Sequence, residues 1–286
     1  MEELEMRFMK FVVPIGFFLF LIAIGYSETD VQKGASIAKA ADDLPIFGDV
    51  RAYLYLRIYD KNGTIKFNKK MIMASHSENI GTPDEIQKFI GYFQEPADDV
   101  GNSMLYINYK NNPSEKYIYL KSIRKIKKVT GSDKSLSFFG SDFTNSDAGK
   151  PDYFEWIYRY LGEKQVAFKG KMIDCYAVEY MPKTEQIKRD HGYGKKILYY
   201  EKNSYLTMKE EFFDDNMNKV KELYLESFIT RNNVKGNQVY YITGLEMKNL
   251  KTGTKTRMLM KDFLFEKNAN VRPDIFNLQY LTRKWW

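Results

Sequence analysis

The amino-acid sequence predicts a mainly β protein, built as one large antiparallel sheet, barrel or sandwich. Three observations lead to this prediction. Apolar and polar residues alternate along many short segments, turn residues separate those segments, and the 286 residues include 22 Tyr and 20 Phe. Alternation is the pattern of a half-buried strand, and aromatic rings fit a pleated surface. Short turns between consecutive strands favour an antiparallel meander.

The N-terminal residues are expected to lie outside the fold. An uncharged apolar run covers residues 11–26, follows Arg7 and Lys10, and leads into small and polar residues. This layout is typical of a secretory signal peptide, here residues 1–27. The run is shorter than the roughly 20 residues that a membrane-spanning helix needs, which disfavours the alternative of an uncleaved inner-membrane anchor. Residues 28–286 are then expected to form a single domain in the periplasm.

The mature chain is expected to begin with a helix and continue with a hairpin. Apolar residues recur near helical spacing within residues 30–44. Residues 50–59 then alternate with a period of two, and Asn62 and Gly63 separate them from a second alternating run, residues 65–74. An Asn-Gly pair between two alternating runs is a strong hairpin signal.

Further strands are expected along the rest of the chain, at residues 88–94, 104–109, 115–120, 124–129, 158–168, 172–181, 195–201, 206–213, 220–229, 239–249 and 254–265. One long connection, residues 131–149, interrupts them. It is rich in Ser, Asp and Gly but also carries Phe138, Phe139 and Phe143. Two interpretations stay open: a lid or binding loop, or a surface loop whose aromatic side chains hold it on the core.

The sequence offers little catalytic or metal-binding chemistry. Neither His76 nor His191 has a second His or Cys at metal-ligand spacing, and His191 is expected in a solvated loop. Cys175 is the only cysteine and is expected to be a small buried hydrophobe. No nucleophile elbow, P-loop or dinucleotide fingerprint is present. We therefore expect no catalytic residues, no metal and no cofactor.

The charge balance points to anionic partners. The net charge is +7, and for an exported protein lipid head groups or an acidic protein surface are more plausible partners than nucleic acid. Five basic residues alternate with apolar ones along one segment: Lys121, Arg124, Lys125, Lys127 and Lys128. This run is either a strand with one solvated face or a docking patch for a membrane or a partner.

The predicted strands are too many for the predicted helix to cover, so a wide curved sheet would leave apolar surface that needs a lid or a ligand. Period-two alternation places a set of apolar side chains on the presumed inner face. The candidate lining of a lipid-binding cavity is Leu54, Leu56, Ile58, Phe67, Met71, Met73, Met104, Tyr106, Leu206, Met208, Phe212, Met258 and Met260. A register error of one residue would turn a whole strand to the other face.

Stretches through most of the mature chain match a known pattern. They include residues 48–52, 93–101 and 117–126, and the most specific one is residues 140–144, preceded by Phe138. Together they resemble the LolA/LolB-like superfamily of outer-membrane lipoprotein-sorting proteins, and within it an uncharacterised periplasmic branch. The resemblance implies an incomplete, half-open antiparallel β-barrel with helices covering the open side. It also implies a lid region, to which Phe138, Phe139, Gly140, Ser141, Asp142, Phe143 and Thr144 contribute.

The function implied by the resemblance is that of a non-catalytic periplasmic carrier or receptor. Such a protein would bind lipid or lipoprotein acyl chains in a hydrophobic cavity, with transient membrane contact and an inner-membrane lipid exporter as a candidate partner. The alternative is a sensor or adaptor of a lipid exporter or of an envelope stress pathway. A further alternative is a hydrolase that uses Ser141, Asp142 and His191.

Overall fold

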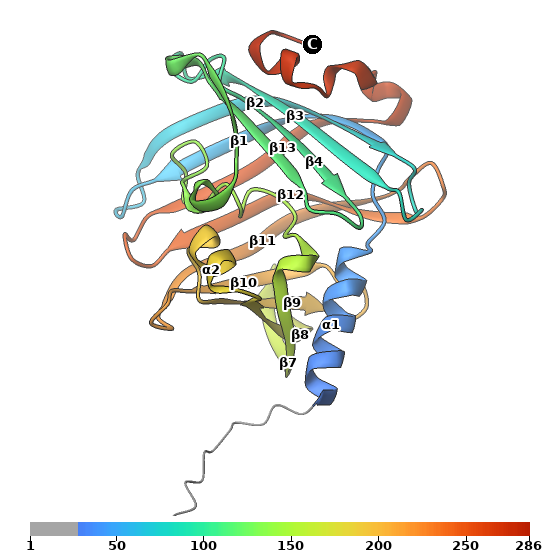
Figure 1. Ribbon diagram of the computed structural model, residues 1–286, viewed down its shortest axis with the longest axis vertical. Coiled ribbons are helices and arrows are strands. Elements are labelled where there is room, and N and C mark those ends of the chain that lie inside the picture. Colours follow the sequence, from blue (N-terminus) through green and yellow to red (C-terminus); the bar gives the residue numbers. More distant parts are fainter. Residues whose placement is uncertain (1–27) are drawn as a thin grey trace, which may run out of the picture.

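The computed structural model describes residues 28–286, which form one 13-stranded antiparallel sheet with two α-helices (Figure 1). The helices are α1 (Glu28–Asp42) and α2 (Glu185–His191). The strands are β1 (Asp49–Tyr59), β2 (Ile65–Glu78), β3 (Ile86–Glu95), β4 (Ser103–Tyr109), β5 (Glu115–Leu120), β6 (Lys125–Lys128), β7 (Trp156–Phe168), β8 (Lys171–Pro182), β9 (Lys195–Glu201), β10 (Thr207–Phe213), β11 (Lys219–Asn232), β12 (Gln238–Asn249) and β13 (Lys255–Phe265).

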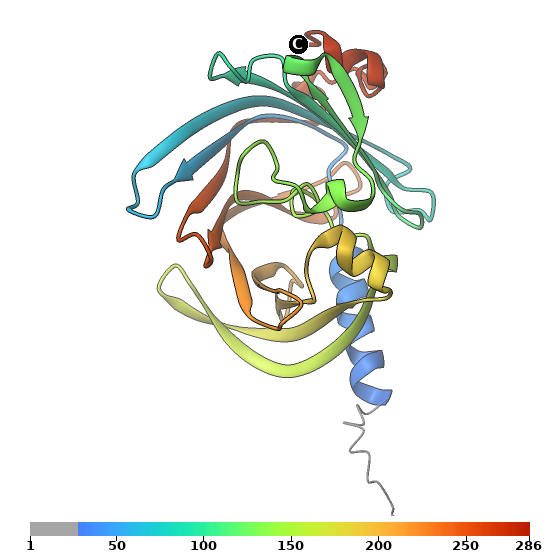
Figure 2. The ribbon, with the colours of Figure 1, turned by 60° about the vertical axis from the view of Figure 1, so that its left-hand side comes forward.

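The sheet consists of two meanders joined by their first and last strands. Its order is β6-β5-β4-β3-β2-β1-β13-β12-β11-β10-β9-β8-β7, so β6 and β7 are the two edges and the sheet is not closed. The sheet curves strongly, and its two ends face each other across an open side (Figure 2). Because β6 and β7 follow each other in the sequence, the chain must cross that open side between them.

These observations confirm the predicted fold class, a mainly β half-open barrel, and each expected strand overlaps an observed one. The expected helix near residues 30–44 corresponds to α1. The expected signal peptide, residues 1–27, lies outside the described residues. Among the helices within residues 28–286, none is long and apolar enough to cross a bilayer.

Helix α1 covers the inner side of the β7 end of the sheet. Ile37 and Ala38 pack in a buried cluster with Tyr158 and Val178. The contact is close because residue 34 is glycine: a Cβ there would lie 2.7 Å from the backbone carbon of Arg159. Small residues therefore let this helix lie directly on the strands.

The C-terminal residues after β13 cover the outer face of the other end of the sheet (Figure 1). They form short 3₁₀ turns, among them Leu278–Thr282, in a region to which the sequence patterns assigned no structure. Leu281 is fully buried in a cluster with Ile90 and Leu105, and the hydroxyl of Ser103 donates a hydrogen bond to the carbonyl of Leu281 at 2.6 Å. The outer face of β2–β4 is thus a second core.

Truncating the buried leucine of this segment should destabilise the protein far more than truncating its exposed neighbour. Leu281→Ala is expected to lower the free energy of unfolding by about 2–5 kcal/mol, since it leaves a cavity in the outer core. Leu278 lies in the same turn and is 42% exposed, so Leu278→Ala should change that energy by less than about 0.5 kcal/mol. Urea unfolding of both variants measures the difference, and equal effects would contradict this packing.

Candidate functional site

The inner face of the sheet carries a continuous apolar wall. Side chains from β1, β2, β4, β10, β11 and β12 meet there in one buried cluster, in which Leu56, Met71 and Met247 have no exposed surface. The alternation of β1 explains its share of the wall, because every second residue of that strand is buried. The wall faces the open side of the half-barrel.

The structure gathers most of the predicted lining residues on this wall. Leu54, Leu56, Met71, Met73, Met104, Tyr106 and Phe212 lie in the cluster, and Met258 and Met260 pack against it. Ile58 is also buried. Leu206 and Met208 belong to a neighbouring buried cluster with Leu225. Phe67 differs from the others, since it lies near the end of the β1–β2 hairpin and is 52% exposed.

The connection between β6 and β7 fills the concavity in front of this wall. We call residues 131–149 the plug. Phe138 and Phe143 are each 1% exposed and belong to the wall's own cluster, and the ring of Phe139 contacts the ring of Phe93, with centroids 4.6 Å apart. The structure shows that this loop enters the concavity and that its aromatic side chains pack in the core. The interpretation as a lid or binding loop stays a prediction.

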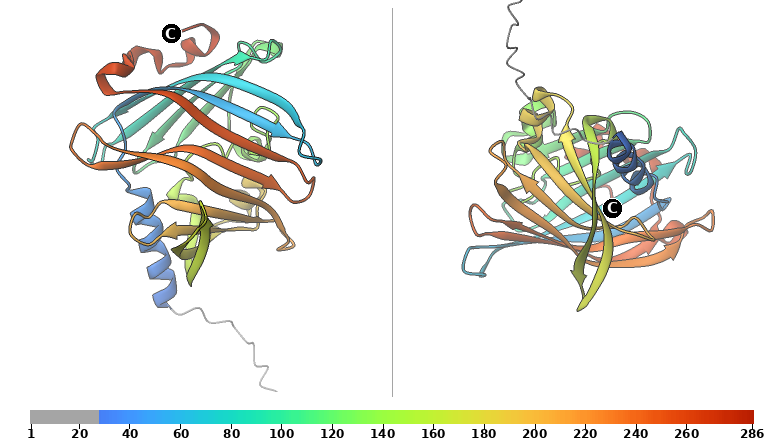
Figure 3. Two further views of the ribbon diagram at one scale, coloured as in Figure 1. Left: turned by 180° about the vertical axis from the view of Figure 1, so that it is seen from behind. Right: turned by 90° about the horizontal axis from the view of Figure 1, so that it is seen from below.

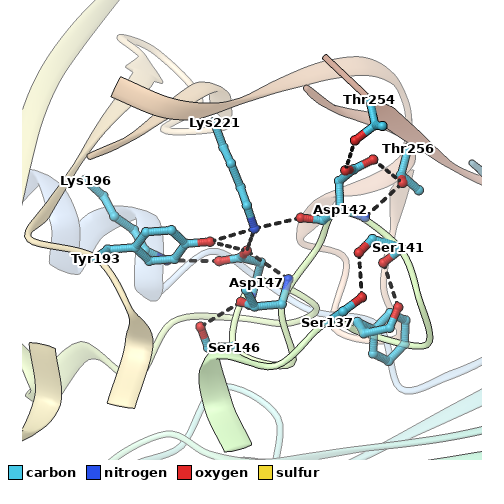
Figure 4. A network of polar contacts seen from close by, with 12 residues as sticks. Ser137, Ser141, Asp142, Ser146, Asp147, Tyr193, Lys196, Lys221, Thr254 and Thr256 are labelled. Carbon is cyan, nitrogen blue, oxygen red and sulfur yellow. Dashed lines mark hydrogen bonds and ion pairs between the residues drawn. The ribbon is translucent and has the colours of Figure 1, made fainter. Parts of the chain in front are cut away.

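Of the other predicted lid residues, Ser141, Asp142 and Thr144 are buried and Gly140 is exposed. Asp142 anchors the plug to β13 and to the residue before that strand (Figure 4). Its carboxylate accepts hydrogen bonds from the hydroxyl of Thr254 at 2.5 Å and from that of Thr256 at 2.8 Å. The backbone N–H of Asp142 donates in turn to the Thr256 hydroxyl at 3.0 Å. These bonds fix the plug at one point on the wall.

Asp147 provides a second anchor, through a buried ion network (Figure 4). Its carboxylate lies 3.4 Å from the ammonium of Lys196 and 3.6 Å from that of Lys221. The hydroxyl of Tyr193 donates to the same carboxylate at 2.8 Å. Lys221 also donates to the backbone carbonyl of Asp142 at 2.7 Å, which links the two anchors. We call these contacts of Asp142 and Asp147 the latch.

The electrostatics of the latch favour the charged form of Asp147. Burial alone would raise the pKa of this carboxyl, but Lys196, Lys221, the Thr144 N–H and the Tyr193 hydroxyl outweigh burial and hold it at about 2. Burial lowers the pKa of Lys221. The latch is therefore a set of buried charges that depend on one another.

A further carboxyl, that of the half-buried Glu210, lies close to the plug. Glu210 lines a cavity of about 100 Å³ beneath α1, together with Tyr180 and Tyr200. Burial raises the pKa of Glu210 to about 7, although the charge of Lys196 acts in the opposite direction. Asp147 raises it further, so this carboxyl responds to the charge state of the latch.

Sequence reasoning did not single out Asp147, Tyr193, Lys196 or Lys221. A signal was present for the two lysines. Lys196 precedes Leu198 and Tyr200, and Lys221 precedes Leu223, at inward positions of strands β9 and β11. A charged residue at the inward position of an apolar alternation needs a buried partner. The sequence alone does not say which carboxylate of a distant loop supplies it.

The residues of the hydrolase alternative do not come together. Ser141 donates to the carbonyl of Phe138 at 2.7 Å, Asp142 is held by the two threonines, and His191 lies 2.6 Å from the carboxylate of Glu155. The expectation that His191 sits in a solvated loop is wrong: it ends α2, and its side chain is 5% exposed. Cys175 is buried, as expected. Within residues 28–286, no three His, Cys, Asp or Glu residues form a group that could hold a metal.

Comparison with solved structures defines the class of this fold. A domain from Vibrio parahaemolyticus, described as an outer membrane lipoprotein-sorting protein, is 22% identical; the match covers 88% of this chain and 100% of that one, with a TM-score of 0.72. A DUF1329 family protein from Desulfovibrio piger is 21% identical over 88% and 99% of the two chains, with a TM-score of 0.73. A LolA superfamily protein from Nitrosomonas europaea is 15% identical over 86% and 98%, with a TM-score of 0.59. The chain has the LolA-like fold, as the sequence resemblance implied.

Family membership follows from the sequence match. A family described as an uncharacterized protein matches residues 85–283, which is more than half of the chain, and the chain belongs to that family. No curated protein matches the chain.

Neutralising the centre of the latch should destabilise the protein in a pH-dependent way. Asp147→Asn leaves Lys196 and Lys221 without their shared carboxylate, and a loss of about 3–5 kcal/mol is expected at pH 7. The pKa of Asp147 lies below its ordinary value of 3.8. Its stabilising effect is therefore present above about pH 4 and is lost as the pH falls toward 2. The difference in free energy of unfolding between wild type and variant should accordingly become smaller below about pH 4.

Urea unfolding at pH 7 and at pH 3 measures this gap. The matched control is Asp215→Asn, since the Asp215 side chain is 66% exposed and its loss should change stability by less than about 0.5 kcal/mol. A gap between wild type and Asp147→Asn that does not change with pH would show that the carboxylate does not act through its charge.

Proposed function

We propose that this protein is a periplasmic carrier or receptor that binds the acyl chains of lipids or lipoproteins against the inner wall of its half-barrel. The observation that carries the proposal is the plug. Phe138 and Phe143 fill an apolar concavity that their own loop spans from edge to edge. In the loaded state the acyl chains take the place of these rings. The plug residues 138–144 then act as the lid.

The size of the hydrophobic effect supports this exchange. Each buried CH₂ contributes about 0.8 kcal/mol, so a long acyl chain offers on the order of 10 kcal/mol before the losses that accompany binding. Part of this energy is used to free the plug. The plug's anchoring groups are polar or charged, and water can solvate them once they leave the wall. No catalytic step is needed for such a cycle.

The other proteins of this fold class support the assignment by analogy. One of them is described as an outer membrane lipoprotein-sorting protein, and acyl-chain binding is the function we transfer to this chain. Export through residues 1–27 would place it in the periplasm. An inner-membrane lipid exporter is the partner that we propose would load it.

A non-catalytic adaptor is the second candidate, and the free sheet edge favours it. Strand β6 is an edge strand, and Lys125, Lys127 and Lys128 on it are exposed. Lys127 and Lys128 pair with Asp133 and Glu115, which leaves Lys125 as the cation of this strand for a partner or membrane surface. This candidate predicts a stoichiometric protein partner and no bound lipid.

Native mass spectrometry of the mature protein, purified from its own periplasm without detergent, distinguishes the two candidates. An added mass equal to a lipid or a lipidated peptide is expected. A clean unliganded mass, together with no binding of a fluorescent fatty acid, would overturn the carrier proposal. A co-purified protein partner in that case would support the adaptor.

Loosening the latch without altering the apolar wall should strengthen acyl-chain binding. Thr256→Val keeps the shape of a fully buried side chain but removes the hydroxyl that bonds Asp142 twice. Losing about 1.4 kcal/mol of plug attachment should tighten the binding of a fluorescent fatty acid about ten-fold. Weaker or unchanged binding in a variant that still folds would show that the plug and the ligand do not compete.

A charge on the inner wall should have the opposite effect. Met258 packs against the inner cluster and is only partly buried, so Met258→Glu is expected to fold and to weaken fatty-acid binding by at least about ten-fold. The control is Met172→Glu on β8, at a position that is 57% exposed and outside the inner cluster, which should leave binding unchanged. Titration of both variants with the same probe makes the comparison, and equal affinities would place the ligand elsewhere.

A further inference from the structure

The wall of the half-barrel has a seam between β12 and β13. These two strands pair only from Gly244–Leu259 to Lys248–Lys255. Beyond that point β12 continues to pair with β11 as far as Gln238, and β13 continues to pair with β1 as far as Phe265. Residues 238–243 and 260–265 therefore each have one edge without a neighbouring strand in the described chain. The two strands diverge in the view from behind (Figure 3).

Irregular pairing on both sides of the seam accounts for the divergence. The β11–β12 ladder shifts register on each side of Ser227, opposite Gly244. The β1–β13 ladder shifts between Arg51 and Tyr53, where Asp262 on β13 has a φ of +57°. Bulges of this kind bend a strand and raise its twist, so each partner is turned away from the other beyond the Gly244–Leu259 pair.

An open hollow of about 500 Å³ lies at the wide end of the seam. The consecutive residues Phe263, Leu264 and Phe265 of β13 line it, with Phe47 and Arg231 among the other lining residues. Side chains of consecutive strand residues point to opposite faces. A hollow lined by three in a row therefore runs along the edge of the strand, where its backbone groups are, and not over one face.

Aromatic and aliphatic side chains and the cation of Arg231 line the hollow, together with Asn232, Asn268 and Glu266. Rings of Tyr241 and Phe263 meet across the seam with centroids 5.3 Å apart, and Phe47 contacts Phe265 at 4.8 Å. The guanidinium of Arg231 lies 5.0 Å from the centre of the Phe265 ring. Among residues 28–286, no carboxylate forms an ion pair with Arg231, which is exposed. The nearby Glu266 accepts hydrogen bonds from the backbone of Gly48 and Asp49.

We propose that the free edge of β13, residues 260–265, binds an extended polypeptide segment of another protein by strand addition. The backbone of the segment pairs with the edge, its apolar side chains enter the hollow, and an acidic group on it pairs with Arg231. This site lies on a strand edge at the seam. Met260, at one end of it, packs against the inner wall, whereas Phe263 and Phe265 pack against a different cluster. The inference does not depend on acyl-chain binding.

The chemistry of the edge favours a polypeptide over a lipid. Unpaired N–H and C=O groups of a strand need hydrogen-bonding partners, which an acyl chain cannot supply. An extended peptide supplies them in a ladder, and pockets for every second side chain give such binding its specificity. A carboxylate on the peptide would form a charge-assisted hydrogen bond with the guanidinium of Arg231.

A synthetic peptide without any lipid tests the inference. The probe is a capped peptide of about eight residues that alternates valine and serine and carries one central aspartate, in keeping with strand addition. Hydrogen exchange of the full mature protein, read by NMR or mass spectrometry, is expected to show new protection at residues 260–265 on addition of the peptide. No new protection at those residues at millimolar peptide would overturn the proposal.

Two methylated peptides test the strand ladder directly. One carries N-methyl groups on the odd residues and the other on the even residues, so only one of them loses the amides that face β13. One methylated peptide should not bind, and the other should bind with an affinity within about three-fold of that of the unmethylated peptide. The reason is that alternate amides point to opposite sides of a strand. Equal effects of the two patterns would show that binding is not a ladder on one edge.

Protein variants locate the site. Arg231→Gln should lower the affinity for the peptide about ten-fold by removing a charge-assisted bond, and Leu264→Asp should abolish peptide binding. Leu250→Asp is the matched control, since Leu250 is 46% and Leu264 38% exposed and Leu250 lies beyond the other end of β12. Arg231-dependent displacement of the peptide by oleate would show instead that the hollow is a fatty-acid site and would overturn the proposal. Neither variant touches the plugged wall, so fatty-acid binding there can succeed or fail independently.

Discussion

The apolar inner wall of an unclosed sheet is the constraint on which the rest of the structure depends. A sheet that ended at β6 and β7 with an uncovered inner face would expose a large contiguous apolar surface, which monomeric proteins avoid. The chain covers that face with the segment that it needs anyway to reach β7 from β6. Connection and cover are therefore one element. Any ligand for the wall has to compete with part of the same chain, in particular with Phe138 and Phe143.

The latch gives this cover an unusual balance of forces. A plug held by aromatic rings alone would resist leaving, since every exposed ring would lose its hydrophobic contribution. The Asp147 network adds charges to the attachment, and buried charges interact strongly with one another but are also well solvated outside. The net contribution of such a network to stability is small compared with the loss on removing one partner. The plug can thus be held in one defined position without being held irreversibly.

Much of the fold could be predicted from the sequence, because period-two alternation reports burial on one face directly. It located all the strands and placed most of the inner wall correctly. The failures have physical reasons. The helix α2 is short and polar and begins with an N-cap at Thr184, so it looked like a loop and His191 was assigned to solvent. The C-terminal 3₁₀ turns that carry Leu281 show no regular alternation of apolar and polar residues from which they could be predicted. The latch joins residues far apart in the chain, such as Asp147 and Lys221, and only the curvature of the sheet with the plug inside it brings them together.

The seam shows a second consequence of leaving a barrel open. In a closed barrel every strand has two neighbours, and a bulge in one ladder is absorbed by the next. Here the β11–β12 and β1–β13 ladders are irregular beside Ser227 and Asp262, and the sheet ends at the free edges β6 and β7 instead of closing. The resulting gap is bridged by the rings of Tyr241 and Phe263 and not by the backbone. The same openness that exposes the inner wall to a ligand therefore also leaves strand edges available to a polypeptide.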